Sequence, residues 1–290
     1  MKHKYCLIPR YRRLMPTVSP RAWPWSASNS PEPFPDGAWV QSLAAIHPLS
    51  LDDEVKKVDS LSLRDLKSWL QGQDVELEDG STETLESWLA KSRMTPVEER
   101  LAFLLPGELA NPNRLVDLAI SGMPIIPVRM DGVCRVWTDV IDGREVSPGI
   151  HHITLARTDG WWETTWLGLP DMEQAQSMTR WLNDGMGTAW RWSKIAEGQL
   201  SLHIGEIIYP PNPEMVNWNG EIEKVESKAP SRSGPLLDWS EIKVILFTRQ
   251  GCYDNRGRLA RCCHIRQRQF HTDMFRRGSA KQWDEIIDIG

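Results

Sequence analysis

Several features that would narrow the identity of this chain are missing from its 290 residues. No apolar run approaches the roughly 20 residues of a membrane-spanning helix, so we expect no such helix. The basic start at residues 1–4 resembles a signal peptide, but Pro9 follows the short apolar run Cys6–Ile8 too soon for a secretion signal. Five cysteines, an odd number, are typical of reduced thiols rather than of a disulfide framework. We therefore expect a cytoplasmic location.

Motifs that name a reaction are also missing. The chain contains neither the G-x-S-x-G turn of serine hydrolases, nor the H-E-x-x-H helix of zinc peptidases, nor the G-x-x-x-x-G-K-[ST] phosphate loop. The stretch Gly185–Gly187 lacks the third glycine of a dinucleotide loop. Asp52 and Asp53 stand near an expected helix start, where carboxylates complement the helix dipole. The sequence therefore favours no particular reaction, and we expect no cofactor.

Tryptophan dominates the aromatic residues, with 15 Trp against 5 Phe and 4 Tyr. An indole offers a large apolar surface and one N–H donor, so it serves protein cores, interfaces and base-stacking platforms alike. We interpret most of these residues as core or packing residues and any exposed one as a candidate stacking platform.

The net charge of −5 conceals an uneven distribution. Residues 1–22 contain six basic residues and no acid, and residues 249–277 contain eight arginines against two aspartates. The body between these segments carries the excess of acid. Segregation of charge of this kind indicates a local binding site for a polyanion rather than nonspecific electrostatic binding over the whole surface.

Residues 1–50 are expected to form a basic, proline-rich arm followed by a first strand region. Seven prolines between residues 9 and 35 remove N–H donors and disfavour both helix and central strand. Trp23 and Trp25 favour an ordered arm that lies along a partner over a loose tail.

Residues 51–123 are expected to form an acidic helical subdomain. Helices are predicted after four capping positions, which are Ser62, Ser81 or Thr82, Thr95 and Asn111. The third of these helices is expected to run through Leu105, and the fourth to end at Gly122.

Residues 124–209 are expected to form an antiparallel sheet with one helix. Four runs of apolar residues are separated by three Asp-Gly pairs, at 131–132, 142–143 and 159–160. Asp-Gly between such runs is typical of a hairpin turn. A helix is predicted from about Asp171 to Leu182.

Residues 210–240, rich in proline, are expected to form a linker, and residues 241–290 a basic, arginine-rich hairpin with a C-terminal tail. A strand from Glu241 to Thr248 is predicted to turn back into a second strand that begins at Arg258. The alternation of side chains along that strand would place on its outer face Arg258, His264, Arg266 and Arg268. The predicted fold class is therefore α+β, with antiparallel β-hairpin sheets, an inserted acidic helical subdomain and a Pro-rich N-terminal arm.

The arginine-rich C-terminal segment is the most informative feature. Arginine contacts phosphate bidentately and stacks on bases, and interleaved aromatic residues suit a single strand better than a duplex groove. The expected nucleic-acid-binding residues are Arg10, Arg12, Arg13, Arg21, Arg249, Arg256, Arg258, Arg261, Arg266, Arg268, Arg276, Arg277, Tyr253 and Phe270. A solvated face, or a face that docks on an acidic protein surface, is the alternative.

A zinc site is an alternative use of the same segment. Its candidate ligands are Cys252, Cys262, Cys263, His264 and His271. Zinc is commonly held by closely spaced pairs of ligands, whereas the spacing of Cys252 and Cys262 fits no standard finger. Adjacent cysteines on a strand would also face opposite ways, so we predict no metal.

Metal-free RNA cleavage remains open. It needs a base for the 2′-hydroxyl group and cations for the phosphate. The candidates for the base are His151, His152, His264 and His271, with Arg266 and Arg268 as the cations. A structural role is the alternative for each histidine.

The sequence thus predicts a nucleic-acid-binding subunit, RNA or a single strand preferred, of a larger ribonucleoprotein assembly. Its general character fits CRISPR-type antiviral defence or other mobile-element machinery. The expected partners are nucleic acid, RNA above all, and other protein subunits, without a membrane or a small-molecule cofactor. Two alternatives stay open: a metal-independent endoribonuclease that processes guide RNA, and a structural assembly protein whose basic face docks on an acidic neighbour.

Overall fold

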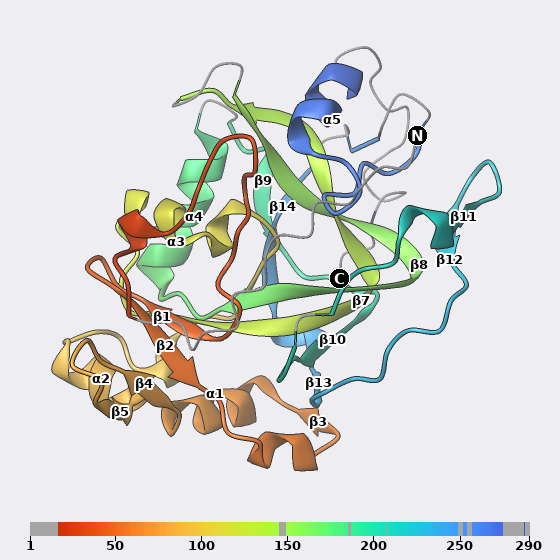
Figure 1. The fold of residues 1–290 in the computed structure, drawn as a ribbon. Helices are drawn as coiled ribbons and strands as arrows, with labels where there is room; N and C mark the ends of the chain where they lie inside the picture. The colour runs from red at the N-terminus through yellow and green to blue at the C-terminus, as the bar shows by residue number, and fades with distance from the viewer. Residues whose placement is uncertain are drawn as a thin grey trace.

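A computed structural model gives the fold of the chain. It describes residues 17–144, 149–184, 187–206, 208–248, 252–253, 257–274 and 287. These residues form a mixed α+β fold with five α-helices and a large, mostly antiparallel sheet (Figure 1). The α+β class predicted from the sequence is confirmed at this level. None of the described helices has the length and apolar character needed to cross a membrane.

The α-helices are α1 (Leu63–Gln71), α2 (Leu85–Lys91), α3 (Pro112–Asp117), α4 (Met172–Asn183) and α5 (Gln267–Met274). The strands are β1 (Trp39–Gln41), β2 (Ile46–Ser50), β3 (Ser60–Leu61), β4 (Asp74–Glu76), β5 (Thr82–Thr84), β6 (Phe103–Leu105), β7 (Met123–Asp142), β8 (Ile150–Gly168), β9 (Trp190–Ser193), β10 (Gln199–Leu202), β11 (Val216–Trp218), β12 (Glu223–Val225), β13 (Leu236–Leu237) and β14 (Lys243–Phe247).

Two long strands, β7 and β8, form the centre of the fold. They pair antiparallel from Ile125 with Gly168 to Asp142 with Ile150. On the far side of β7 the sheet continues through β1, β2 and β4 to β5, and on the far side of β8 through β6 and β14 to β9. The strand β9 therefore lies at one end of this row of strands.

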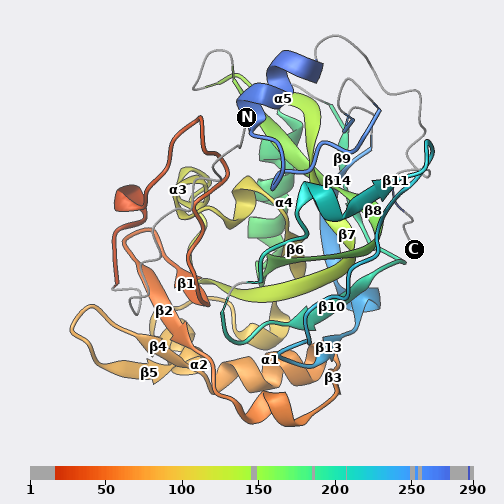
Figure 2. The same cartoon turned by 45° about the vertical axis from the view of Figure 1, so that its right-hand side comes forward.

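The Asp-Gly pairs at 131–132 and 159–160 do not form the hairpin turns predicted from the sequence. Asp131 pairs with Trp162 whereas Val133 pairs with Arg157, so the register shifts across a bulge. Gly132 and Gly160 have φ angles of 82° and 74°, a left-handed conformation that glycine adopts without steric cost. The dipeptide that favours a turn bends a continuous strand here, and Figure 2 shows both strands curving along their length.

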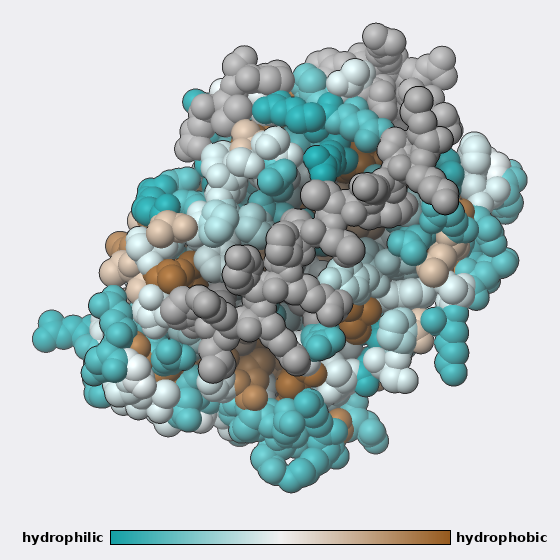
Figure 3. Space-filling view, in the orientation of Figure 1, coloured by the Kyte–Doolittle hydropathy of each residue, from teal (hydrophilic) through white to brown (hydrophobic). Residues whose placement is uncertain are grey.

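The first part of β7, Met123–Val128, is buried on both faces, which explains its continuous run of apolar residues and prolines. Ile126 and Val128 belong to a core cluster that also contains the buried leucines of α1 and α2. Met123 and Ile125 belong to a second cluster, which contains Leu115 of α3 and the apolar face of α4. Helices therefore cover both faces of the central sheet, and the outer surface seen in Figure 3 is mostly hydrophilic.

Three of the predicted helix starts are confirmed. The side chains of Ser62 and Asn111 accept hydrogen bonds from the first turns of α1 and α3, and Asp171 forms a capping box at the start of α4. The cap of α2 is Thr84, rather than Ser81 or Thr82, because residues 82–84 pair as strand β5.

The helix predicted from Thr95 through Leu105 is wrong. Val97–Glu99 form a short 3₁₀ turn, and Phe103–Leu105 form β6 between β8 and β14. The three residues of β6 are all apolar, and they form a strand that is buried on both faces. Pairing with two neighbouring strands outweighs the local capping signal.

The second strand predicted from Arg258 is also wrong. Leu259 and Arg261 form only isolated bridges, and residues 267–274 form helix α5. Figure 1 shows α5 beside the end of the β7–β8 hairpin, where Phe270 is fully buried against Trp137. Residues 210–240, expected as a linker, contain the short strands β11, β12 and β13.

The described part of the proline-rich segment packs along α3. Asn111 Nδ2 donates to the Pro31 carbonyl at 2.7 Å, and Asn113 Nδ2 donates to the Trp23 carbonyl at 2.7 Å. The guanidinium of Arg114 lies 4.8 Å from the centre of the Trp25 ring. These contacts hold this segment against the body of the protein.

Candidate nucleic-acid interface

An open groove of about 680 Å³ lies between α4 and β9. One wall is the face of α4 on which residues recur at helical spacing, namely Gln176, Thr179, Arg180 and Asn183. The other wall is the segment that leads into and along β9, namely Gly187, Thr188, Trp190, Arg191 and Trp192. The groove therefore joins a helix face to an edge of the sheet.

The side chain of Asn183 covers part of that edge. Its Nδ2 donates to the Trp190 carbonyl and its Oδ1 accepts from the Trp190 N–H, both at 2.8 Å. Alternate residues of a strand direct their backbone groups to the same side, so the N–H and C=O of Trp192 also point toward the groove. The groove thus offers backbone hydrogen-bonding groups as well as side chains.

The groove is cationic. Arg180 and Arg191 are exposed on its two walls, and neither forms an ion pair with any residue that the structure describes. The Lys243 ammonium lies 4.9 Å from the centre of the Trp192 ring, at the β9 side. Arg191 Nε donates to the Thr188 carbonyl at 3.3 Å. A guanidinium without a carboxylate partner keeps its remaining N–H donors for an incoming anion.

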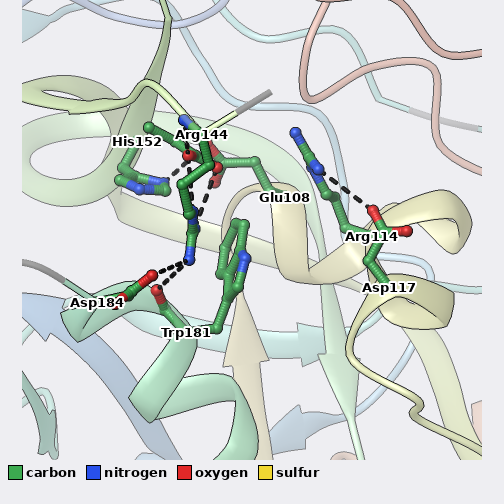
Figure 4. A network of polar contacts seen from close by, with 8 residues as sticks. Glu108, Arg114, Asp117, Arg144, His152, Trp181 and Asp184 are labelled. Atoms are coloured by element: carbon green, nitrogen blue, oxygen red, sulfur yellow. Dashed lines mark hydrogen bonds and ion pairs between the residues drawn. The ribbon is translucent and has the colours of Figure 1, made fainter. Parts of the chain in front are cut away.

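A network of polar contacts, of which the His152–Glu108 pair is buried, reaches from β8 to the end of α4 (Figure 4). The ring of His152 meets Trp181 at 5.3 Å and Trp190 at 5.6 Å, both edge to face. Its Nδ1 lies 3.2 Å from Oε1 of Glu108, and both side chains are buried. Trp190 therefore connects the floor of the groove to this His–Glu pair.

Arg144 links the end of β7 to the last turn of α4. Its guanidinium lies 4.8 Å from the centre of the Trp181 ring and pairs with Asp142 at 2.8 Å and Asp184 at 3.0 Å. Burial favours the neutral acid of Asp142, but the hydrogen bonds and charge of Arg144 outweigh it and lower the pKa of that carboxyl group. These contacts fix the last turn of α4, and with it one wall of the groove.

The C-terminal arginines predicted to bind nucleic acid include two that serve the fold. Arg258 and Arg261 both pair with Glu223 of β12, at 2.9 and 3.1 Å. Arg261 is 2% exposed and lies over the Trp161 ring at 4.9 Å. Arg261, predicted from the sequence to bind nucleic acid, is therefore held inside the fold, because a guanidinium removed from water needs a carboxylate and Glu223 supplies it.

The other predicted arginines are dispersed. Arg21 pairs with Asp117, Arg266 is exposed, and Arg268 Nη1 donates to the Gly149 carbonyl at 3.0 Å. Seven lie outside the described residues, namely Arg10, Arg12, Arg13, Arg249, Arg256, Arg276 and Arg277.

Neither predicted stacking residue is exposed. Phe270 is fully buried, in contact with Trp137 and His151. Tyr253 is half-buried and bridges to Leu259. As the structure stands, a base cannot stack on Phe270.

The four candidate histidines occupy three places. His151 Nε2 lies 3.0 Å from His271 Nδ1, at the contact of β8 with α5. His152 faces Glu108, and His264 Nε2 bonds to the Pro211 carbonyl at 2.7 Å. The structure therefore brings together one pair of histidines and gives each of the others a partner within the fold.

The candidate zinc ligands do not converge. Among the described residues, no three His, Cys, Asp or Glu side chains lie close enough together to hold a metal ion. Burial raises the pKa of Cys134 to about 11 and also raises the pKa of Cys262. Raised values oppose the thiolate form that binds zinc. Cys252 is buried beside Trp161, whereas His271 lies on α5.

Comparisons of the chain with protein-family models, with curated proteins and with solved structures found no match.

Sequence reasoning missed the groove because its two arginines belong to elements that only the fold brings together. The helix predicted from about Asp171 to Leu182 corresponds to α4, but Arg191 was placed only within the sheet region expected for residues 124–209. The one signal there is the run Trp190–Trp192, in which two indoles flank an arginine.

Proposed function

We propose that the protein binds single-stranded nucleic acid, RNA preferred, along the groove between α4 and β9. The observation that carries the proposal is the pair Arg180 and Arg191, exposed on the two walls of an open groove and unmatched by any described carboxylate. Guanidinium groups in such a setting bind phosphate oxygens through paired hydrogen bonds.

The remaining groups of the groove suit a flexible strand better than a duplex. Gln176 and Thr188 offer an amide and a hydroxyl group, and the edge at Trp192 offers an N–H and a C=O. Sequence-tolerant contacts of this kind reach ribose hydroxyls and base edges, which a single strand exposes and a duplex hides.

In this proposal the protein acts in the cytoplasm as a subunit of a larger ribonucleoprotein assembly of CRISPR-type or other mobile-element machinery. A net charge of −5 supports little general attraction to polyanions, so affinity must come from local cationic sites. The basic segment at residues 1–13 and the pair Arg276 and Arg277 are proposed as further contributors from outside the described residues. Arg258 and Arg261 are left out, because Glu223 already pairs with both.

Fluorescence anisotropy of a labelled oligouridylate at ~50 mM salt tests the proposal. The double variant Arg180→Glu with Arg191→Glu is expected to weaken binding at least ~10-fold and to reduce the slope of log affinity against log salt by about 1.4, because each contacted single-strand phosphate contributes about 0.7. Arg64→Glu with Arg93→Glu is the matched control. It makes the same change in net charge at two exposed arginines of the α1–α2 region.

An equal loss in both double variants would mean that net charge, not the groove, governs binding. If the unmodified protein binds no oligonucleotide, the proposal is wrong, and docking of the basic segments on an acidic protein becomes the leading alternative. Cleavage of the bound RNA in the presence of a chelator would point instead to the metal-independent ribonuclease.

A further inference from the structure

Ser233 Oγ and His203 Nδ1 lie 3.0 Å apart, in a part of the fold separate from the groove. His203 follows β10 and Ser233 precedes β13, and the antiparallel pairing of these strands brings them together. The pairing extends past the strand ends, because Ile204 N donates to Ser233 Oγ at 3.2 Å. A Cβ on Gly234 would lie 2.5 Å from the Leu202 carbonyl oxygen, so glycine is needed for this close approach.

The other nitrogen of the His203 ring determines its tautomer. Nε2 lies 2.6 Å from the carbonyl oxygen of Glu206. A carbonyl oxygen can only accept, so Nε2 carries the proton and Nδ1 is the acceptor for the Ser233 hydroxyl. Gly205, with a φ of 137°, makes the turn that returns this carbonyl to the ring. A hydroxyl, a base and a group that orients the base are the parts of an activated serine.

The surroundings favour a neutral imidazole. His203 is 2% exposed. Burial lowers its pKa, and the charge of Arg129 adds to this effect, while the hydrogen bond to Glu206 opposes it. Arg129 faces the ring from β7 and is itself paired with Asp131 at 2.7 Å. The ring therefore keeps Nδ1 free to accept a proton at neutral pH.

The serine, in contrast to the histidine, is only half-buried. One lone pair of its Oγ accepts from Ile204 N–H, and its hydroxyl proton points to His203. The second lone pair is then left for an electrophile that arrives from solvent.

We propose that Ser233 is a nucleophile and His203 its general base, in a site that acts on small carboxylic esters. Ser233 Oγ attacks the carbonyl carbon while its proton passes to His203 Nδ1. The Oγ–C bond forms, the bond from that carbon to the alkoxy oxygen breaks, and the alcohol leaves with the proton held by His203. Water, activated by the same nitrogen, then hydrolyses the acyl-serine and restores the hydroxyl group.

This site shares no residue with the groove between α4 and β9, so each proposal can fail without the other. Sequence motifs did not indicate it, because Ser233 lies in the run S-R-S-G rather than in G-x-S-x-G. Its partner comes from a different strand.

Labelling with a fluorophosphonate, followed by peptide mass spectrometry, tests the proposal on the full chain. An adduct is expected on Ser233 and on no serine of the Ser233→Ala variant, while Ser231→Ala, an exposed serine nearby, leaves labelling unchanged. His203→Gln is expected to slow labelling by a factor of at least ~100. The rate of p-nitrophenyl acetate hydrolysis should likewise be lost in Ser233→Ala, be reduced in His203→Gln and stay unchanged in Ser231→Ala.

Because His203 is buried, its variant has to be checked for folding by circular dichroism. The pH dependence of labelling in the unmodified protein is the second measurement and needs no variant. The rate should fall with decreasing pH as a single group takes up a proton, because a protonated His203 cannot accept one from Ser233. Absence of a Ser233 adduct, or equal labelling of a folded His203→Gln protein, overturns the proposal.

Discussion

The Nε2 of His151 and the Nδ1 of His271 lie 3.0 Å apart and join β8 to α5. His151 Nδ1 is 2.7 Å from the carbonyl oxygen of Thr138, which can only accept, so this nitrogen carries the proton. His151 Nε2 is therefore the acceptor, and His271 Nδ1–H donates to it. The ring of Phe270 packs edge to face on His151 at 4.9 Å. A neutral His151 thus helps to hold α5 on the hairpin.

This contact predicts that stability falls in mild acid. Burial is the main cause that lowers the pKa of His151 to about 4, against about 6.5 in an unfolded chain. Because the unfolded chain takes up the proton first, the stabilisation is fully present above pH ~6.5 and is lost progressively as the pH falls toward about 4. The difference between the folded and unfolded pKa of His151 corresponds to about 3 kcal/mol in the free energy of unfolding.

Urea unfolding between neutral pH and pH ~4 measures this loss. His151→Gln is expected to be less stable at neutral pH but to lose less with falling pH. Burial also lowers the pKa of His203 and His264, which contribute with the same sign. The test is therefore the difference between the two pH profiles, and parallel profiles would show that His151 does not titrate with unfolding.

A second prediction concerns Glu223, whose removal should lower the free energy of unfolding. Its carboxylate pairs with both Arg258 and Arg261. Glu223→Ala leaves the buried Arg261 guanidinium without this charge, so we expect a loss of about 3 to 5 kcal/mol in the free energy of unfolding.

The neighbouring Lys224 is the matched control for Glu223. It points to the other side of β12 and pairs with Asp159 across an exposed surface, at 3.2 Å. Lys224→Ala should cost less than ~1 kcal/mol by urea unfolding. Similar losses in the two variants would show that Glu223 is not a structural partner of the C-terminal arginines.

The parts of the fold that were predictable from sequence are those decided by local chemistry. Ser62, Asn111 and Asp171 cap their own helices, so each start could be recognised within a few residues. The apolar run Lys243–Phe247 likewise matched a strand. In these segments the local preference and the tertiary environment agree.

Prediction failed where distant partners decide the outcome. Arg258 and Arg261 were predicted to bind nucleic acid, because nothing near them in the sequence reveals their partner Glu223. Asp131-Gly132 and Asp159-Gly160 read as turns, because a glycine with positive φ serves a bulge equally well. The groove combines Arg180 and Arg191 through the packing of α4 on β9, which no local pattern encodes.

The bulge at Gly160 predicts a third effect. A Cβ at this residue would lie 2.1 Å from the Val225 carbonyl oxygen, and its φ of +74° disfavours any other residue. Gly160→Ala should therefore push β12 away from β8 and destabilise the protein by roughly 1 to 3 kcal/mol. Gly143→Ala, where nothing lies within 4 Å, is the control and should change the melting temperature little. Equal melting temperatures would mean that β12 yields without cost.

A variant of Asn183 can distinguish the contribution of the groove's shape from that of its charge, because Asn183 is neutral and contacts Trp190. This prediction rests on the proposed function. Asn183→Ala removes both hydrogen bonds that cover the edge of β9. Oligonucleotide binding should weaken, but the dependence of affinity on salt should stay the same, because a neutral side chain releases no counterions. The arginine variants, in contrast, should reduce that dependence.

Gln176→Ala is the control for Asn183, because it removes an exposed amide from the same wall of α4 without touching β9. If the two variants weaken binding equally, the amides act by direct contact, and the edge of β9 contributes nothing. If Asn183→Ala changes the salt dependence, the groove has rearranged its arginines, so that Asn183 positions Arg180 or Arg191 as well as the strand. An unchanged affinity in Asn183→Ala, with a folded protein, would place the bound strand away from the edge of β9 altogether.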